Sequence, residues 1–248
     1  MKAFTTIVLL ALISLSCGAP KKLPSYLRFC KRSDPNFDDC TLRLLNSIQP
    51  NVAKGVPQIH SPSLDPFVIP ALQLNRDTDN LQLRANLKNL QAYGASQYQV
   101  TKLRTDIKNN AVEVSVLLPL LKVTTEYDVK GRVLVIPLNG KGIFKADITN
   151  VQADIKMTGK VIEKRGKKYL EVTNVSSKVK VGNVKVDPST GNPRNDLITQ
   201  SAMDFWENNK RQVLDVIAPV TDETTDAIVQ QVANRILATL PYDTILPP

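Results

Sequence analysis

The chain has 248 residues, of which 42% are apolar and 22% charged, enough apolar material for one sizeable core without a second domain. Its formal net charge is +9, but basic residues are mixed with acidic ones and aromatic residues make up only 5%, which argues against a nucleic-acid surface. One histidine and three cysteines leave few groups for catalysis or metal binding. We therefore expect no catalytic site, metal, cofactor or nucleic-acid partner, and we expect a monomer.

Residues 1–19 have the pattern of a secretory signal peptide. Lys2 precedes an apolar run at 7–15, and the small residues Gly18 and Ala19 follow it. The run is too short to cross a bilayer and remain there. We therefore expect cleavage near residue 19 and a secreted, extracellular protein with a single domain at 20–248.

Cysteine usage agrees with export. Removal of residues 1–19 takes away Cys17 and leaves Cys30 and Cys40 as an even pair, which favours a disulfide. Closing so short a loop contributes about 2 to 3 kcal/mol in the chain-entropy model. After Cys40 we expect a short helix that is ended by Pro50 and marked by Leu42, Leu45 and Ile48.

Apolar and polar side chains alternate between residues 61 and 186, the period of half-buried strands. The apolar faces lie at 81–87, 103–107, 112–118, 123–129, 144–148 and 153–157. We expect turns at 109–110, 130–131, 139–142 and 164–167, where Gly and Asn gather. At 133–138 both faces are apolar, so the inward face is left open there. The pattern predicts an antiparallel meander that forms a large curved sheet.

Residues 195–240 show the spacing of one long amphipathic helix, after a break at Pro188, Gly191 and Pro193. Its apolar positions are Ile198, Ala202, Phe205, Trp206, Val213, Val216, Ile217, Val229, Val232, Ala233, Ile236, Leu237 and Leu240. Pro219 predicts a kink or break, with the run 221–223 starting a new first turn. The dry face of the sheet needs a cover, so we expect an α+β fold in which a strongly curved antiparallel sheet wraps this C-terminal helix.

Several segments occur in an order that points to a known family: KKLPSYLRFC at 21–30, the closely spaced Cys30 and Cys40, SLDPFVIP at 63–70, PLNGKGIFKADITNV at 137–151, and the ending FWENNKRQVLDVIAP with ILATLPYDTILPP. Together they resemble the insect takeout and juvenile-hormone-binding proteins. The resemblance implies a long helix wrapped by a curved sheet, shared more distantly with lipid-binding proteins of the bactericidal/permeability-increasing type. It also implies an elongated apolar tunnel for a lipophilic ligand. Juvenile-hormone carriers have a second disulfide, and no cysteine follows Cys40 here, so the takeout-like branch fits better.

We therefore expect a carrier that binds a long hydrophobic molecule, such as a fatty acid, an isoprenoid or a juvenile-hormone-like terpenoid, in an internal tunnel. Candidate lining residues are Phe67, Val114, Val116, Tyr127, Phe144, Ile148, Ile155, Phe205, Val213, Ile217, Val229, Val232 and Ile236. Ordinary core packing would account for any one of them. Tyr127 is the most informative, because a phenol on a dry face needs a hydrogen-bond partner, which a ligand or the backbone could supply.

Two alternatives stay open. The basic charge and the distant kinship favour a membrane-surface or lipopolysaccharide-binding defence protein, and a transient contact with an anionic membrane suits a carrier as well. A secreted lipid-modifying enzyme would need His60 as its base, although a surface imidazole explains this residue better. Asn174 begins a glycosylation sequon.

Overall fold

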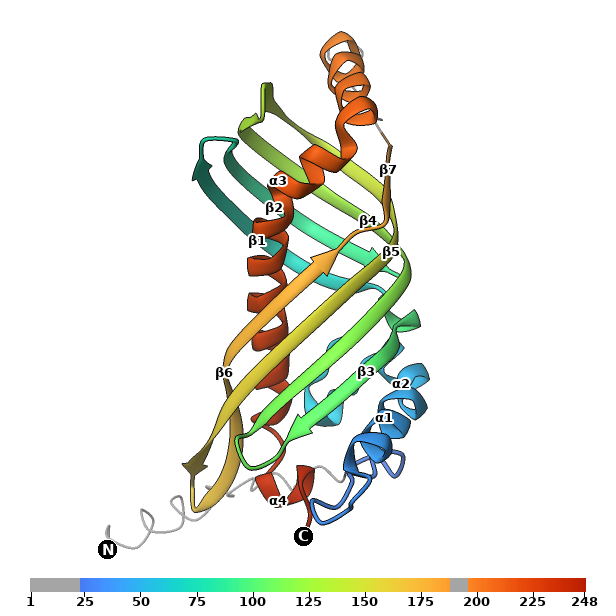
Figure 1. Ribbon diagram of the computed structural model, residues 1–248, viewed down its shortest axis with the longest axis vertical. Helices are drawn as coiled ribbons and strands as arrows, with labels where there is room; N and C mark the ends of the chain where they lie inside the picture. The colour runs from blue at the N-terminus through green and yellow to red at the C-terminus, as the bar shows by residue number, and fades with distance from the viewer. Residues whose placement is uncertain (1–22, 188–195) are drawn as a thin grey trace, which may run out of the picture.

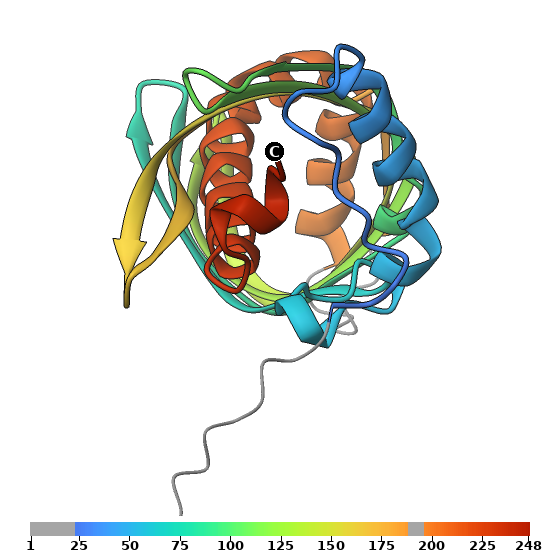
Figure 2. The ribbon, with the colours of Figure 1, turned by 90° about the horizontal axis from the view of Figure 1, so that it is seen from below.

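The computed structural model describes residues 23–187 and 196–248, so the expected signal peptide and the break at 188–193 lie outside the described residues. One antiparallel sheet has the strand order β1-β2-β4-β5-β6, with β3 paired to β4 and β7 paired to β5. Seen from its end, the sheet curls into most of a ring (Figure 2). The strands are β1 Phe67–Thr78, β2 Leu81–Tyr93, β3 Gln99–Asp106, β4 Ala111–Val133, β5 Ile136–Lys164, β6 Lys167–Lys180 and β7 Asn183–Asp187.

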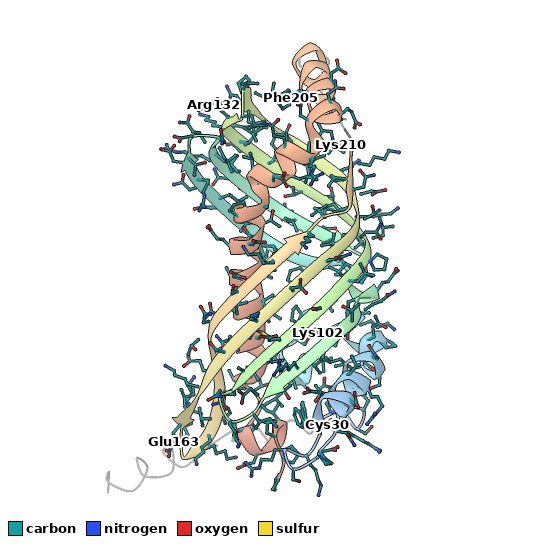
Figure 3. The ribbon with its side chains drawn as sticks, viewed as in Figure 1. Cys30, Lys102, Arg132, Glu163, Phe205 and Lys210 are labelled. Atoms are coloured by element: carbon teal, nitrogen blue, oxygen red, sulfur yellow. A yellow bond between two sulfur atoms is a disulfide. The ribbon has the colours of Figure 1, made fainter. Side chains whose placement is uncertain are left out.

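Strands β4 and β5, of 23 and 29 residues, form the spine of the sheet. They pair along the whole length of β4, from Ala111 opposite Thr158 to Val133 opposite Ile136 (Figure 1). We call the end of the molecule that holds the β4–β5 turn the upper end. The end that holds Cys30 and the β5–β6 turn is the lower end, as the labels in Figure 3 show for Arg132, Cys30 and Glu163.

The predicted turns at 109–110 and 164–167 are confirmed, whereas those at 130–131 and 139–142 are wrong, because these residues lie within β4 and β5. The β4–β5 turn is at 134–135 instead. The glycines on either side of this turn let other groups lie close to the backbone. A Cβ on Gly131 would lie 1.9 Å from the Gln82 carbonyl oxygen, and one on Gly142 would lie 3.3 Å from the Tyr127 ring. A glycine needed for close approach looks the same in a sequence as a glycine needed for a turn.

Two places in the sheet change which residues face inward. Pro70 lies opposite Asn89, and Pro119 lies opposite Asn150; both asparagines have a φ of 52°. Proline gives no N–H to the ladder, and asparagine tolerates the left-handed region. Before Pro119 the even-numbered residues of β4 face inward, since Glu113 pairs with Lys156 on the outer face and the buried Ala153 lies opposite Val116; after Pro119 the odd-numbered residues face inward. The predicted faces at 112–118 and 123–129 therefore lie on the same side of one continuous strand.

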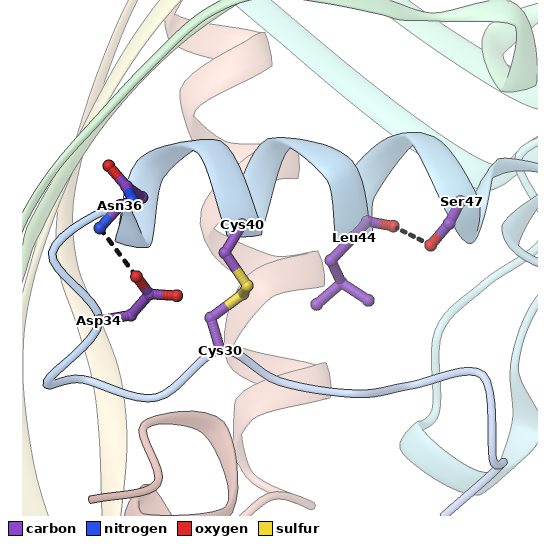
Figure 4. The surroundings of a disulfide bond; sticks show 6 residues. All are labelled: Cys30, Asp34, Asn36, Cys40, Leu44 and Ser47. Atoms are coloured by element: carbon purple, nitrogen blue, oxygen red, sulfur yellow. Dashed lines mark hydrogen bonds between the residues drawn. A yellow bond between two sulfur atoms is a disulfide. The ribbon is translucent and has the colours of Figure 1, made fainter.

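Within residues 23–187 and 196–248, four α-helices accompany the sheet: α1 Phe37–Ser47, α2 Gln49–Ala53, α3 Asp196–Leu237 and α4 Tyr242–Ile245. The predicted disulfide between Cys30 and Cys40 is confirmed and ties the segment before α1 to that helix (Figure 4). Pro50 lies in the first turn of α2 rather than simply ending a helix. A proline is tolerated there, since the missing N–H would have no partner within the helix.

The long helix α3 does not break at Pro219. Its one non-helical residue is Asn209, whose φ is −131°, so the predicted break at 219 and the new start at 221–223 are wrong. The physical reason is that Asp222 does not cap a helix end. Its side chain is buried and binds β6 after the proline, while Val213 packs against Leu81 and Val133 before it.

A polar stripe on α3 covers the free edge of β6. The Val172 N–H donates to Asn234 Oδ1 at 2.8 Å, and Asn234 Nδ2 donates to the Val172 carbonyl at 2.9 Å. Gln230 Nε2 donates to the same carbonyl at 3.3 Å, and the Val179 N–H donates to Asp222 Oδ1 at 2.9 Å. These side chains therefore bond the edge strand as a further strand would, and α3 lies across the opening of the ring (Figure 2).

The same stripe carries a charge pair. Lys178 Nζ donates to Asp222 Oδ2 at 2.9 Å, and this hydrogen bond and the carboxylate charge raise the pKa of Lys178. Lys178 is exposed, so the pair itself adds little to stability. The bond from the Val179 N–H to Asp222 Oδ1 matters more, because an unpaired N–H shielded from water is costly.

Replacing Asn234 with Leu should destabilise the fold, because the Val172 N–H would lose its acceptor. We expect a loss of about 2 kcal/mol in the free energy of unfolding, measured by urea denaturation. Gln231→Leu is the matched control, since Gln231 is exposed on the same helix and should change stability by less than about 0.5 kcal/mol. Equal shifts for both variants would contradict the edge-covering role of Asn234.

Candidate apolar ligand-binding interior

The concave inner face of the sheet is apolar and its outer face is charged. On the outer face Lys156 pairs with Glu113 at 2.9 Å and Lys141 pairs with Asp128 at 2.7 Å. The hydrogen bond from Lys156 and its charge lower the pKa of Glu113. The residues that alternate with these charged ones along each strand, such as Val114 on β4, point inward.

Along β4 most of the inner face is only half-buried. All eleven residues at 111–121 of β4 are of intermediate exposure, although β4 is a central strand. A filled core would bury the large inward side chains almost completely. The interior between the sheet and α3 is therefore incompletely filled, and the side chains that line it are apolar.

Packed clusters lie toward the two ends. At the lower end the buried residues Leu27, Val56, Ile59 and Leu240 pack together. At the upper end Leu81 and Val133 pack with Val213 of α3. The half-buried stretch of β4, residues 111–121, lies along the strands between these two clusters.

An apolar cavity of about 220 Å³ lies within the upper cluster. Its lining combines β2, the β4–β5 turn region and α3: Leu81, Leu83, Val133, Ile136, Leu138, Phe205, Trp206, Val213 and Ile217. Trp206 Nε1 is buried and has no acceptor within the described residues. Three predicted lining residues, Phe205, Val213 and Ile217, therefore meet in one cavity.

A groove of about 440 Å³ separates α3 from β1, the other edge of the sheet. Phe67 and Val232 from the predicted set line it, together with the exposed Val68. Arg76 Nη1 reaches across to Glu223, with distances of 2.8 and 3.0 Å to its two carboxylate oxygens. Helix α3 is thus bonded to the backbone of β6, whereas its polar contact with β1 is between side chains at the surface.

The remaining predicted residues lie on the inner face or on α3. Val114, Val116, Tyr127, Phe144, Ile148 and Ile155 are half-buried on inward positions of β4 and β5. Val229 is half-buried on α3, and Ile236 packs against the lower cluster. Sequence reasoning missed Leu83, Ile136 and Leu138 as lining residues. The alternating pattern identified Leu83 as inward, but the doubly apolar run at 133–138 concealed the other two.

Tyr127 is a half-buried polar residue on the inward side of β4. Its ring lies over Gly140 and Gly142 of β5, where a side chain would crowd it. The Tyr127 hydroxyl makes no hydrogen bond within the described part of the chain. A phenol in that position offers one donor and one acceptor to a molecule in the interior.

Reactive groups do not converge. His60 is exposed at the end of a short 3-10 turn, Pro57–Ile59, and its imidazole makes no hydrogen bond among residues 23–187 and 196–248. Within those same ranges no cluster of His, Cys, Asp and Glu could hold a metal ion. None of the described helices is long and apolar enough to cross a bilayer.

Comparison with known proteins agrees with this architecture. The model of the haemolymph juvenile hormone binding protein family matches residues 7–247. A putative beta-carotene-binding protein of Schistocerca gregaria is 22% identical, covering 87% of this chain and 86% of its own length. The circadian clock-controlled protein daywake of Drosophila melanogaster is 21% identical, covering 95% and 92%.

Among solved structures, Takeout 1 of Epiphyas postvittana superposes with a TM-score of 0.71 at 18% identity, covering 89% of this chain and 99% of that one. Lipopolysaccharide binding protein reaches only 0.31 at 9% identity, which gives the defence-protein alternative no support. The fold is thus a curled sheet closed by a long helix around an apolar interior. The chain belongs to the haemolymph juvenile hormone binding protein family, with the fold of a takeout protein, and the predicted resemblance is confirmed.

Proposed function

We propose that this protein is a secreted, non-enzymatic carrier that binds one long hydrophobic molecule in an internal tunnel between the sheet and α3. The observation that carries the proposal is the inner face, which is apolar but only half-buried along β4. Binding would transfer the ligand's apolar surface from water into a preformed apolar interior, which is favourable in proportion to the area buried. The thirteen predicted lining residues are the candidates for contact with the ligand.

The ligand is best matched by a fatty acid, an isoprenoid or a juvenile-hormone-like terpenoid. The half-buried stretch of β4 extends over the eleven residues 111–121. A relative bears the name of a putative beta-carotene-binding protein, beta-carotene being a long isoprenoid. The unpartnered Tyr127 hydroxyl and the buried Trp206 N–H would favour a molecule that also carries a hydrogen-bond acceptor. A ligand of this kind is long and apolar with one weakly polar group.

Secretion is part of the proposal. It is supported by the signal-peptide pattern at 1–19, by the disulfide and by a family named from haemolymph. Asn174 is exposed on β6, so its sequon is accessible for glycosylation. We propose a monomer that contacts an anionic membrane transiently when it exchanges its cargo.

Native mass spectrometry of protein purified from a eukaryotic secretion host should show a stoichiometric hydrophobic molecule. Organic extraction followed by mass spectrometry would then identify its class. A chain that is empty on purification and also fails to take up fluorescent fatty acids and terpenoids would contradict the carrier function.

Val116→Trp and Val232→Trp should reduce uptake of a fluorescent fatty acid, because each adds a large ring to a different part of the interior. Val116 is half-buried at an inward position of β4, and Val232 lines the groove beside β1. We expect uptake to fall about tenfold or more for whichever side chain borders the ligand. Lys122→Trp, on the exposed outer face of β4, is the control. Wild-type uptake by both inner variants, with unchanged circular dichroism, would exclude this tunnel.

Trp206 is the single tryptophan of the chain and lines the upper cavity, so its fluorescence reports occupancy there. A fatty acid brominated at the methyl end and one brominated near the carboxyl group should quench Trp206 to different extents, because bromine quenches at short range. The stronger quencher identifies which end enters the cavity. Equal, negligible quenching by both saturating ligands would place the ligand away from the upper cavity.

A further inference from the structure

The β5–β6 hairpin extends outside the ring formed by the sheet and α3, at the lower end (Figure 2). Its tip holds four basic residues within five positions: Lys164, Arg165, Lys167 and Lys168. All four are exposed, and none has an acidic partner within ion-pair distance in the described part of the chain. By contrast, Lys160, further from the tip, pairs with Glu171 at 3.5 Å.

The arrangement of these cations does not serve local stability. Lys164 and Lys167 are directly opposite each other in the strand ladder, beside the turn formed by Arg165 and Gly166. Like charges in that position repel and destabilise a hairpin. A hairpin tip needs only a turn with positive φ values, which Gly166 and Arg165 supply, so the charges call for a different explanation.

An open cleft of about 720 Å³ adjoins the tip, between the hairpin and the C-terminal segment. Lys167, Lys168 and Arg32 contribute its positive charge, and Val161 and Tyr242 contribute its apolar surface. Val161 is 40% exposed. The one acidic residue in the lining, Asp243, is 3.7 Å from Arg32. Cationic side chains beside exposed apolar ones suit a surface that is anionic outside and apolar beneath.

We propose that the tip of this hairpin, Lys164 to Lys168 with the adjoining cleft, docks the protein on a bilayer that contains anionic phospholipid. The phosphate and carboxylate groups of the lipids meet the four cations, and Val161 contacts the acyl boundary. An acidic protein would satisfy the charges but gives no role to the exposed Val161 beside them. The proposal assigns the membrane contact of the proposed carrier to one site, although docking does not itself require a loaded interior.

Vesicles of phosphatidylcholine with about 30% phosphatidylserine should bind the wild-type protein in a flotation assay, and vesicles of phosphatidylcholine alone should not. Binding should weaken strongly between about 0.05 M and about 0.3 M salt, as exposed charges are screened. Lys164→Glu should weaken binding about tenfold or more, since it changes the local charge by two units. The variant should keep its fold, because it replaces a repelling pair with an attracting one.

Lys130→Glu is the matched control. Lys130 is exposed near the upper end of β4 and faces another cation, Arg84, across the ladder, so the change in net charge and in pairing is the same. It should bind vesicles nearly as the wild type does. Equal losses of vesicle binding for both variants would show that net charge alone causes the effect, and this result would overturn the proposal.

Two further results would also overturn it: no binding to anionic vesicles by the wild type, or binding only to a soluble polyanion such as heparin with the same dependence on Lys164. Uptake of a fluorescent fatty acid without vesicles separates this proposal from the carrier function. Normal uptake by Lys164→Glu with lost docking supports a dedicated docking site. Failure of uptake by the wild type concerns the carrier function alone.

Discussion

The covering of exposed strand edges is the constraint on which the rest of the structure depends. A curled sheet that does not close on itself leaves backbone donors and acceptors free at its edges. Helix α3 covers β6 with Asp222, Gln230 and Asn234, which bond the backbone as a neighbouring strand would. Helix α1 binds the backbone of β3 in the same way, because the Thr105 N–H donates to Asp38 Oδ1 at 3.1 Å. Side chains on helices thus replace the missing strands.

The two long edges of the sheet, β6 and β1, make different contacts with α3, and this difference determines the form of the interior. At β6 the helix is bonded directly to the backbone, whereas at β1 a groove remains and Arg76 reaches Glu223 across the surface. An exposed ion pair contributes little stability. Pro70, which lacks an N–H, lies on this edge, where proline also discourages pairing with another chain. Helix α3 therefore bonds β6 directly and leaves a groove between itself and β1.

Periodicity predicted the architecture because burial on one side of a sheet or helix forces a period on the sequence. The faces at 112–118 and 123–129 and the long helix followed from it, whereas the disulfide was predicted from the even cysteine pair of an exported chain. The turns at 130–131 and 139–142 failed since glycine also permits close approach, as at Gly142 beneath Tyr127. The predicted break at Pro219 and new start at 221–223 failed because Asp222 binds the backbone of β6, 43 residues earlier, which no local pattern reveals. For the site, the sequence predicted which side chains point inward. It did not predict which of them line the upper cavity, the groove beside β1 or the open inner face.

An interior left unfilled has a cost that the remaining structure must offset. Each large apolar side chain that stays half-exposed forfeits part of the roughly 2 kcal/mol that full burial would contribute. Compensation comes from features that need no central core: the continuous pairing of β4 with β5, the short disulfide loop, and packed clusters toward both ends. An apolar molecule that enters the interior would complete the burial of the inner face. The free energy of that burial would then favour binding. Binding should therefore stabilise the fold, as any ligand does that prefers the native state.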